Sequence, residues 1–373
     1  MRIVYVSNSR IPTRKAHGAQ ITHMCSAFTD SGAEVELVVP RKRNFLGVDP
    51  FEYYRIEKNF SIRQIPIPDL GSMTSRFPRL MLFADLFAFS MALLLARVAG
   101  RGDVVYCRDY PLLFLFSPRR NTIAIEVHDV PKTRGIFLRA IARARVVVAI
   151  TEGVKGALVA LGIDASRIVV AHDAVRLEDF SHPESKADAR RRLGLPPDKK
   201  LALYIGRIDD WKGTDTFFVA AARLPANVRA TVIGGEDGQV KALKKKHPNV
   251  LFLGARPYRE LADNQAAADA LVLPNTARFD ISSKYTSPLK LFSYMASGIP
   301  IVASGVPSIR EILDERAAYF VAPDDPPALA AGIERALADP GAPGKAARAR
   351  AIVQGYTWRA RARNIMERLR APV

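Results

Sequence analysis

The feature that most constrains the fold is a regular alternation of short aliphatic runs with longer amphipathic segments. Segments 19–31, 136–143 and 153–161 have the amphipathic pattern of helices. Between such segments, runs rich in Val, Ile and Leu predict strands at 3–7, 34–40, 62–66, 104–107, 123–128, 146–150 and 168–171. Strands that are apolar on both faces and separated by helices are typical of a parallel sheet. The first half is therefore predicted to be an α/β domain.

The alternation stops at a polar stretch, 173–188, and then starts again. Further strands are predicted at 201–205, 228–233, 250–253, 270–273, 300–303 and 319–321. A length of 373 residues suits two domains of ordinary size better than one. We predict two Rossmann-like domains, 1–180 and 181–356, with a hinge near 173–198 and a last helix, 357–373, that packs back on the first domain.

The chain is strongly basic, with a formal net charge of +18 and an excess of cations in both halves. A nucleic-acid-binding arm usually concentrates such an excess in one block, so no specific nucleic-acid partner is predicted. A dispersed excess suits anionic ligands such as nucleotide phosphates, or an acidic membrane leaflet. A generally basic, solvated surface explains the charge equally well.

Cysteine content and apolar stretches bear on the compartment. The two cysteines, Cys25 and Cys107, lack metal-ligand spacing and favour a reducing compartment over a disulfide framework. Met1 leads directly into a strand-like run, so we expect no secretory signal and a cytoplasmic protein. The apolar stretch 80–96 is short for a membrane span and contains Asp85. We interpret it as a buried or interface-facing helix, with peripheral attachment to the inner face of the cytoplasmic membrane as a hypothesis.

Two cations lie in the loop after the predicted strand 201–205. Gly206 ends that strand, and Arg207 and Lys212 precede a helix that begins near Thr214. In open parallel sheets, ligands bind beyond the carboxyl ends of the strands. A guanidinium that grips phosphate oxygens and an ammonium point charge would stabilise the charge that develops on a diphosphate leaving group. Two ordinary surface cations in a solvated loop are the alternative.

A second anion site is predicted where the helix after residue 287 begins. Ser287 is a favourable N-cap and Pro288 suits the first helical turn. The free N–H groups of Leu289 and Lys290, with the positive end of the helix dipole, would then attract an anion. A well-capped structural helix explains the same residues without a ligand.

Other strand exits carry a histidine or glycines. His128 follows the predicted strand 123–128 and could orient a sugar hydroxyl, although a lone histidine is often structural. Gly18, after the first strand, would let the backbone approach a ligand closely. Gly234 would make room for a nucleotide base or ribose. The G-x-G-x-x-G, Walker A, zinc-ligand and Ser-His-Asp patterns are absent from the sequence, so the cofactors and metals that they bind are not predicted.

Taken together, these motifs resemble glycosyltransferase family 4, whose retaining enzymes have the GT-B fold of two Rossmann-like domains facing across a cleft. The resemblance covers nearly the whole chain and is most specific in the Arg207–Lys212 loop and in the Ser-Pro-Leu-Lys helix start at 287–290. Tyr-Thr-Trp at 356–358 also matches.

The resemblance implies a role for each matching residue. Arg207 and Lys212 would hold the diphosphate of a nucleotide-sugar donor, helped by the amides of Leu289 and Lys290. His128, as a third catalytic residue, and Gly18 would lie near the transferred sugar. The loop from Gly254 to Tyr258 would border the base of a UDP-, GDP- or ADP-sugar. Transfer would need no metal and would retain the anomeric configuration.

The chain departs from the family pattern at two positions. Family members usually carry two glutamates that correspond to Tyr285 and Ser293 here. Ser293 would give the donor ribose only a neutral contact, worth about 1–2 kcal/mol less than a carboxylate. Tyr285 puts the usual pose of the sugar in doubt.

We therefore expect a retaining, metal-independent glycosyltransferase that uses a nucleotide-sugar as co-substrate and needs no other cofactor. Its acceptor is expected to be a carbohydrate or a lipid-linked or envelope polysaccharide precursor. Two alternatives stay open: a catalytically weak nucleotide-binding or scaffold subunit, favoured by Tyr285 and Ser293, and a sugar-nucleotide epimerase.

Overall fold

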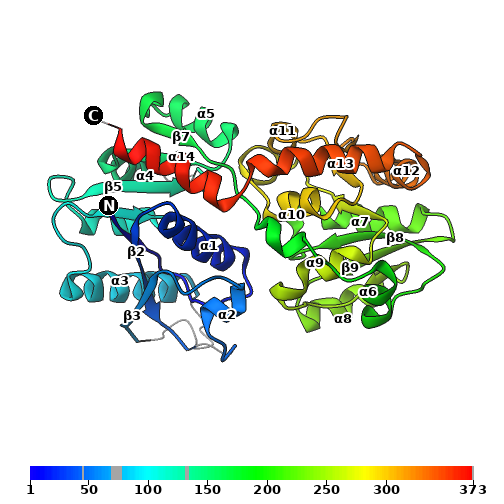
Figure 1. Ribbon diagram of the computed structural model, residues 1–373, viewed down its shortest axis with the longest axis horizontal. Coiled ribbons are helices and arrows are strands. Elements are labelled where there is room, and N and C mark those ends of the chain that lie inside the picture. Colours follow the sequence, from blue (N-terminus) through cyan, green and yellow to red (C-terminus); the bar gives the residue numbers. More distant parts are fainter. Residues whose placement is uncertain (44–45, 69–77, 131–133, 372–373) are drawn as a thin grey trace. The chain divides into compact units, whose positions relative to one another are not determined.

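The computed structural model describes residues 1–43, 46–68, 78–130 and 134–371, which form two compact units (Figure 1). The first unit comprises Met1–Ile150, Val154–His172 and Trp358–Val373. The second unit comprises Thr151–Gly153 and Asp173–Thr357.

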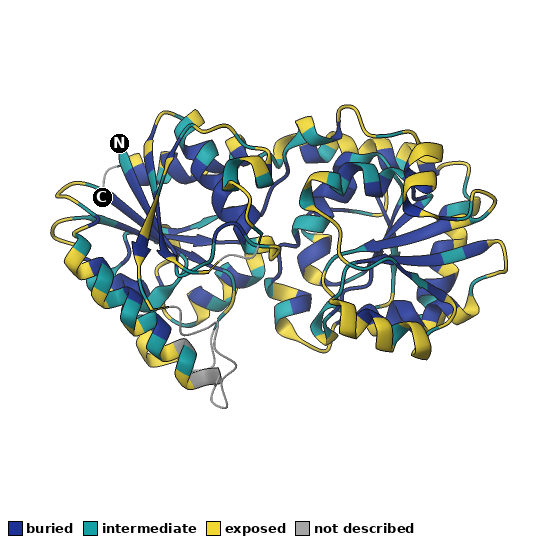
Figure 2. Cartoon of the chain, turned by 90° about the horizontal axis from the view of Figure 1, so that it is seen from below, coloured by how far each residue is buried: buried dark blue, intermediate teal, exposed yellow. Residues whose placement is uncertain are grey.

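The first unit is built on a seven-stranded parallel sheet with the order β3-β2-β1-β4-β5-β6-β7. Its strands are β1 (Arg2–Val6), β2 (Glu34–Arg41), β3 (Ser61–Pro66), β4 (Val104–Cys107), β5 (Thr122–Val127), β6 (Val146–Ala149) and β7 (Ile168–Val170). Its helices are α1 (Ala16–Asp30), α2 (Pro50–Tyr54), α3 (Pro78–Ala96), α4 (Arg134–Arg143), α5 (Glu152–Ala160) and α14 (Trp358–Arg370). Strands β4 and β6 are buried along their whole length, as expected for strands covered on both faces. The strands of both units are largely dark blue, the colour of buried residues, in Figure 2.

The second unit is built on a six-stranded parallel sheet with the order β10-β9-β8-β11-β12-β13. Its strands are β8 (Lys200–Ile205), β9 (Val228–Ile233), β10 (Val250–Phe252), β11 (Ala270–Leu273), β12 (Ile301–Ser304) and β13 (Tyr319–Val321). Its helices are α6 (Lys186–Leu193), α7 (Thr214–Ala220), α8 (Asp237–Lys246), α9 (Leu261–Ala266), α10 (Leu289–Ser297), α11 (Pro307–Arg310), α12 (Pro326–Ala338) and α13 (Ala342–Ile352).

Strand β8 shows how a continuous apolar run supports two cores. Successive side chains of a strand point to opposite faces of the sheet. Leu203 therefore joins the core on one face, with Leu291 of α10, while Tyr204 joins the core on the other face, with Phe217 of α7. Such a strand has no polar face, so its sequence reads as an unbroken hydrophobic run.

The expected fold class is confirmed, because every predicted run contains a strand and both sheets are parallel. The division between the units differs from the expected boundary at residue 180. The chain leaves the first unit after His172 and returns to it at Trp358, and the stretch between them, Asp173–Thr357, belongs to the second unit. The amide of Asp173 donates to Ser287 Oγ at 2.7 Å, and Val175 pairs with Thr357.

The order of each sheet sets where its functional loops lie. In each unit the first strand lies in the middle of the sheet: β1 between β2 and β4, and β8 between β9 and β11. The chain leaves this strand on one side and later returns on the other, so the carboxyl end of the first strand borders the switch point where ligands bind in open α/β sheets. Gly206 follows β8 at such a point.

Helix α3 has an apolar outer face as well as an apolar inner face. Phe89 and Leu93 are buried, whereas Phe83, Phe87 and Leu95 are 71%, 69% and 82% exposed. Within the described residues, no helix combines the length and apolarity needed to cross a membrane.

Helix α14 belongs to the first unit, where it packs against α1. The indole of Trp358 is buried and stacks on the ring of His23, with centroids 5.5 Å apart. This contact fixes the start of the returning helix.

We expect Trp358→Ala to lower the free energy of unfolding of the first unit by about 3–5 kcal/mol, because it removes a large buried ring. Urea unfolding followed by circular dichroism measures this change. Arg359→Ala, at an exposed position of the same helix, is the control and should stay within about 0.5 kcal/mol. Equal effects of the two substitutions would contradict the anchoring role of Trp358.

Candidate functional site

Three neighbouring strands of the second unit end in glycines. Gly206, Gly234 and Gly254 follow β8, β9 and β10, and all have positive φ. A Cβ on Gly234 would lie 1.9 Å from the carbonyl oxygen of Gly206, and the amide of Gly234 donates to Gly254 O at 2.8 Å. Gly234 is therefore required by backbone packing, and its predicted role in making room for a nucleotide base or ribose stays a prediction. The result is an edge where three backbones approach closely.

The ammonium group of Lys290 lies against this edge. Its Nζ donates to the hydroxyl of Tyr204 at 2.7 Å and lies 4.0 Å from the centre of that ring. A Cβ on Gly206 would come within 3.4 Å of the same Nζ. Lys290 thus places its side-chain amine at this edge of the sheet, in addition to the backbone amide that the sequence predicts for an anion site.

Lys212 carries a second ammonium close enough to interact with the first. Burial lowers the pKa of Lys290 well below its ordinary value, and the charge of Lys212 lowers it further. Burial and the charge of Arg207 lower the pKa of Lys212 to about 8, although Asp209 and Asp173 oppose the change. Two partly desolvated cations that repel each other are stabilised by an anion placed between them.

Arg207 is the most accessible of the three cations. Its side chain is 62% exposed, and its Nη2 lies 3.1 Å from Asp209 Oδ1. The pair is solvent-exposed on the arginine side, so the guanidinium can exchange this partner for another oxyanion at small cost. Asp209 is not among the predicted site residues. It restrains Arg207 through this ion pair, and its negative charge raises the pKa of Lys212.

Helix α10 begins later than predicted. It spans Leu289–Ser297 with Pro288 as the N-cap residue and has no side-chain cap. The expected N-cap role of Ser287 is wrong, because its Oγ accepts the amide of Asp173. Across the described residues, the amides of Leu289 and Lys290 have no hydrogen-bond acceptor. The start of the helix therefore keeps the free donors and the positive dipole end expected of an anion site.

Ser293 is buried within the protein. It is 2% exposed, its Oγ accepts from Gln265 Nε2 at 3.0 Å, and it donates to Lys290 O at 3.0 Å. Both bonds are internal, so Ser293 has a packing role between α10 and α9, and the expected ribose contact stays a prediction. Tyr285 is half-buried at the end of a π-helical turn, Ile281–Tyr285.

Tyr258 begins a short 3₁₀ turn after Gly254, Tyr258–Glu260, and is half-buried. Burial and the nearby carboxylate of Asp179 raise the pKa of its hydroxyl. The phenol therefore stays protonated at neutral pH and can donate a hydrogen bond.

The remaining candidates, Gly18 and His128, belong to the first unit. Gly18 lies inside α1, and a Cβ there would be 2.1 Å from the hydroxyl of Tyr54. Its lack of a side chain is required by packing against Tyr54, and the predicted approach to a ligand stays a prediction. His128 follows β5, is 26% exposed, and its Nε2 lies 2.6 Å from Glu126 Oε1. The carboxylate partner was missed at the sequence level, although it stands two residues earlier.

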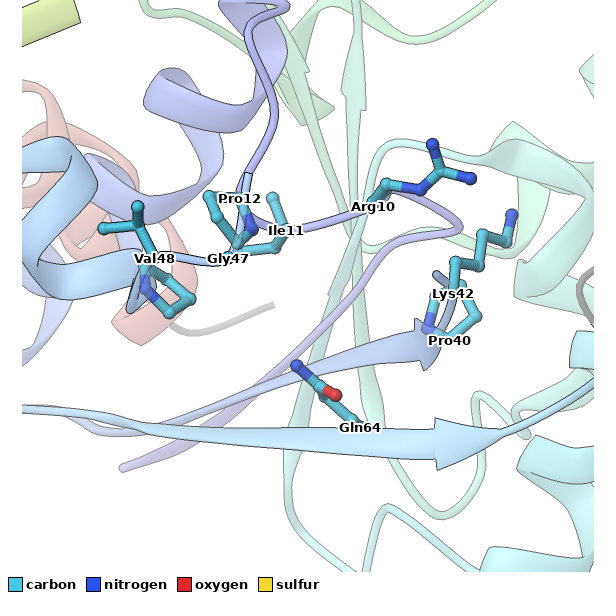
Figure 3. Close-up of a pocket in the computed structure, with 9 residues that line it drawn as sticks. Arg10, Ile11, Pro12, Pro40, Lys42, Gly47, Val48 and Gln64 are labelled. Atoms are coloured by element: carbon cyan, nitrogen blue, oxygen red, sulfur yellow. The ribbon is translucent and has the colours of Figure 1, made fainter. Parts of the chain in front are cut away.

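A separate hollow of about 260 Å³ lies in the first unit, near the carboxyl ends of β1 and β2. Arg10, Lys42 and Gln64 border it (Figure 3). Lys42 is held by Asp85 and by Asn8, so its charge is already compensated. None of the predicted site residues lines this hollow. Elsewhere in the described parts of both units, no group of three or more His, Cys, Asp or Glu side chains could hold a metal ion.

Residues 199–339 match the family model described as "Glycosyl transferases group 1". The chain is 31% identical over 272 residues to D-inositol 3-phosphate glycosyltransferase of Xylanimonas cellulosilytica, and the match covers 67% of this chain and 64% of that protein. The chain thus matches slightly less than two thirds of the length of this relative.

Solved structures share the fold along almost the whole chain. Sucrose-phosphate synthase of Thermosynechococcus elongatus superposes with a TM-score of 0.78 at 20% identity, covering 99% of this chain and 98% of that chain. HepE of Anabaena, in complex with UDP and glucose, superposes with a TM-score of 0.75 at 19% identity and 99% coverage of both chains.

The affinity of the second unit for a small anion should depend on pH. Lys212 is protonated below about pH 8, so affinity for sulfate, whose charge is constant in this range, should fall about tenfold as the pH rises from 7 to 9. An NMR titration at several pH values measures it. Lys212→Met should weaken binding at pH 7 and lose most of this dependence, whereas Lys241→Met, on the exposed face of α8, should behave like the wild type. Affinity that stays constant with pH in the wild type would exclude Lys212 from the anion site.

Proposed function

Because the chain belongs to the group 1 glycosyltransferases and has the GT-B fold, we propose that it transfers a sugar from a nucleotide-diphosphate donor to an acceptor. The observation that carries the proposal is geometric: the Lys290 Nζ lies against Gly206 beyond the end of β8, close enough to Lys212 for the two charges to interact, and the start of α10 has no side-chain cap. A diphosphate is an anion of suitable charge for such a site.

In the proposed reaction, the bond between the sugar C1 and the phosphate oxygen breaks, and its electron pair stays on the leaving phosphate. The acceptor oxygen bonds to C1 on the same face of the sugar, so the anomeric configuration is retained. The acceptor's proton passes to the leaving phosphate oxygen. Arg207, Lys212 and the amides of Leu289 and Lys290 stabilise the charge that develops on that oxygen, which is work that a metal ion performs in other transferases.

Arg207 supplies the most testable part of this scheme. Removing one group that stabilises developing charge typically costs about 2–4 kcal/mol of barrier, so Arg207→Ala should lower the transfer rate about 100-fold or more. Transfer and donor hydrolysis are measured with a panel of UDP-, GDP- and ADP-sugars. Arg223→Ala, an exposed arginine of the same unit, is the matched control.

Each outcome of this assay separates the candidate functions. Full activity of Arg207→Ala would exclude the mechanism. Nucleotide binding without turnover of any donor would favour a binding subunit, the alternative that Tyr285 and Ser293 motivate at the positions of the family's glutamates. Conversion of the donor sugar to an epimer without acceptor would indicate an epimerase.

We further propose that the acceptor is a lipid-linked or envelope polysaccharide precursor and that the protein works at an anionic membrane surface on the cytoplasmic side. The outer face of α3 supports this proposal. Leu80, Phe83, Phe87, Met91, Leu94 and Leu95 are exposed there, and all lie within one third of the helix circumference at 100° per residue. Arg97 and Arg101, both exposed, follow the helix directly and could contact lipid phosphates.

The double variant Phe83→Ser/Phe87→Ser should weaken binding to vesicles that contain anionic lipid by at least about tenfold, since burying one such ring is worth about 1.5–3 kcal/mol. Co-sedimentation at several vesicle compositions measures it. Ile136→Ser, which removes a large exposed apolar side chain from α4 of the same unit, is the control and should bind like the wild type. Wild-type binding that ignores lipid charge would contradict the proposed membrane contact.

A further inference from the structure

The carboxylate of Glu126 is an unusually well-coordinated buried acceptor. It is 1% exposed at the end of β5. Gln20 Nε2 donates to its Oε1 at 2.5 Å, and the hydroxyl of Tyr106 donates to its Oε2. The guanidinium of Arg361, from α14, reaches both oxygens, each at 3.2 Å. His128 Nε2 also lies 2.6 Å from Oε1.

This environment keeps Glu126 ionised. Burial alone would raise the pKa of its carboxyl, but Arg361, His128 and Arg108 hold the pKa well below the ordinary value. Arg361 is itself fixed, because its Nε donates to His172 O at 2.8 Å. Since an ionised carboxylate has no proton to donate, it acts only as an acceptor toward the histidine.

The protonation state of His128 and the position of its proton have different causes. Burial, together with Arg108 and Arg361, lowers the pKa of its imidazole to about 4, against the opposite influence of Glu126. The ring is therefore neutral at physiological pH and carries one proton. The short contact with an acceptor places this proton on Nε2. Among the residues that the structure describes, none makes a hydrogen bond with Nδ1, and the side chain is 26% exposed.

We propose that Glu126 is a positioning residue that holds the proton of His128 on Nε2 and so presents Nδ1 to the ligand as a hydrogen-bond acceptor. The matching ligand group is a hydroxyl that donates, as the hydroxyls of a carbohydrate do. Arg361 keeps Glu126 ionised for this purpose. Gln20 stabilises the arrangement from α1, with its own Oε1 held by Arg108. The nature of the ligand rests on the proposed function, whereas the placement of the proton does not.

The protonation state can be read directly by NMR. Long-range ¹H–¹⁵N spectra of the imidazole rings give the tautomer of each histidine, and a His128→Phe variant assigns the signal among the six histidines. We expect a neutral Nε2–H form for His128 throughout pH 6–8. A protonated ring at pH 7, or a proton on Nδ1, would overturn the proposal.

Substitutions then test whether Glu126 is the cause. Removing Glu126 alone leaves Arg361 buried without its partner, which is strongly destabilising, so the single variant is not a suitable test. The double variant Glu126→Leu/Arg361→Met removes both charges and preserves apolar packing. In this variant, His128 should become a mixture of the two neutral tautomers. Trp358→Phe, which loosens α14 without touching Glu126, controls for a general effect of that helix and should leave the Nε2–H form unchanged. A double variant that keeps the pure Nε2–H form would overturn the proposal.

Kinetics supply a second readout. In the double variant, kcat/KM for sugar transfer should fall about threefold to tenfold, the usual range for one neutral hydrogen bond. The Kd of the nucleoside diphosphate without sugar should not change. In a His128→Phe background the same double change should have no further effect, because Glu126 acts through that ring. A further loss there would show a structural role and contradict the proposal. If the wild type turns over no donor, the proposed function fails, and the NMR result still decides the role of Glu126.

Discussion

Parallel pairing of β8 with both β9 and β11 is the constraint on which the candidate site of the second unit depends. Parallel strands end at the same edge, so the segments after β8 and β9 meet there although they are distant in sequence. Gly234 allows its backbone to approach that of Gly206 closely. The missing side chain of Gly206 leaves room for the side chain of Lys290. Burial disfavours the charged forms of Lys212 and Lys290, and Asp209 opposes this effect at both residues. An anion bound between them is part of the proposed function.

The sequence was sufficient to predict the architecture because both sheets are made of strands buried on two faces. Such strands read as continuous apolar runs, and each one was located. The cation-bearing loop was also predictable, since Arg207 and Lys212 stand next to a strand end. Both signals depend only on residues that are neighbours in sequence, so they can be read without knowledge of tertiary contacts.

The contacts that the sequence could not predict join residues that are remote in sequence. Ser287 reads as an N-cap, but the amide of Asp173 occupies its hydroxyl. Gly18 reads as a site of ligand approach, but the hydroxyl of Tyr54 fills the space next to it. Ser293 reads as a weak substitute for a glutamate, but Gln265 from α9 engages it. Arg361 forms its ion pair with Glu126, a residue 235 positions away in sequence, so no local pattern indicates it. Periodicity and residue spacing are the signals that a sequence carries, and none of these long-range contacts produces either signal.

The return of α14 to the first unit has a consequence for biosynthesis. A ribosome makes β1 to β7 first, then the whole second unit, and only afterwards the residues from Trp358 onward. Until Arg361 emerges, Glu126 lacks its cationic partner, and the surface of α1 that receives Trp358 stays open to water. The first unit, although translated first, is therefore the later of the two to reach its complete native packing, and in a nascent chain it is the unit that a chaperone would encounter unfinished.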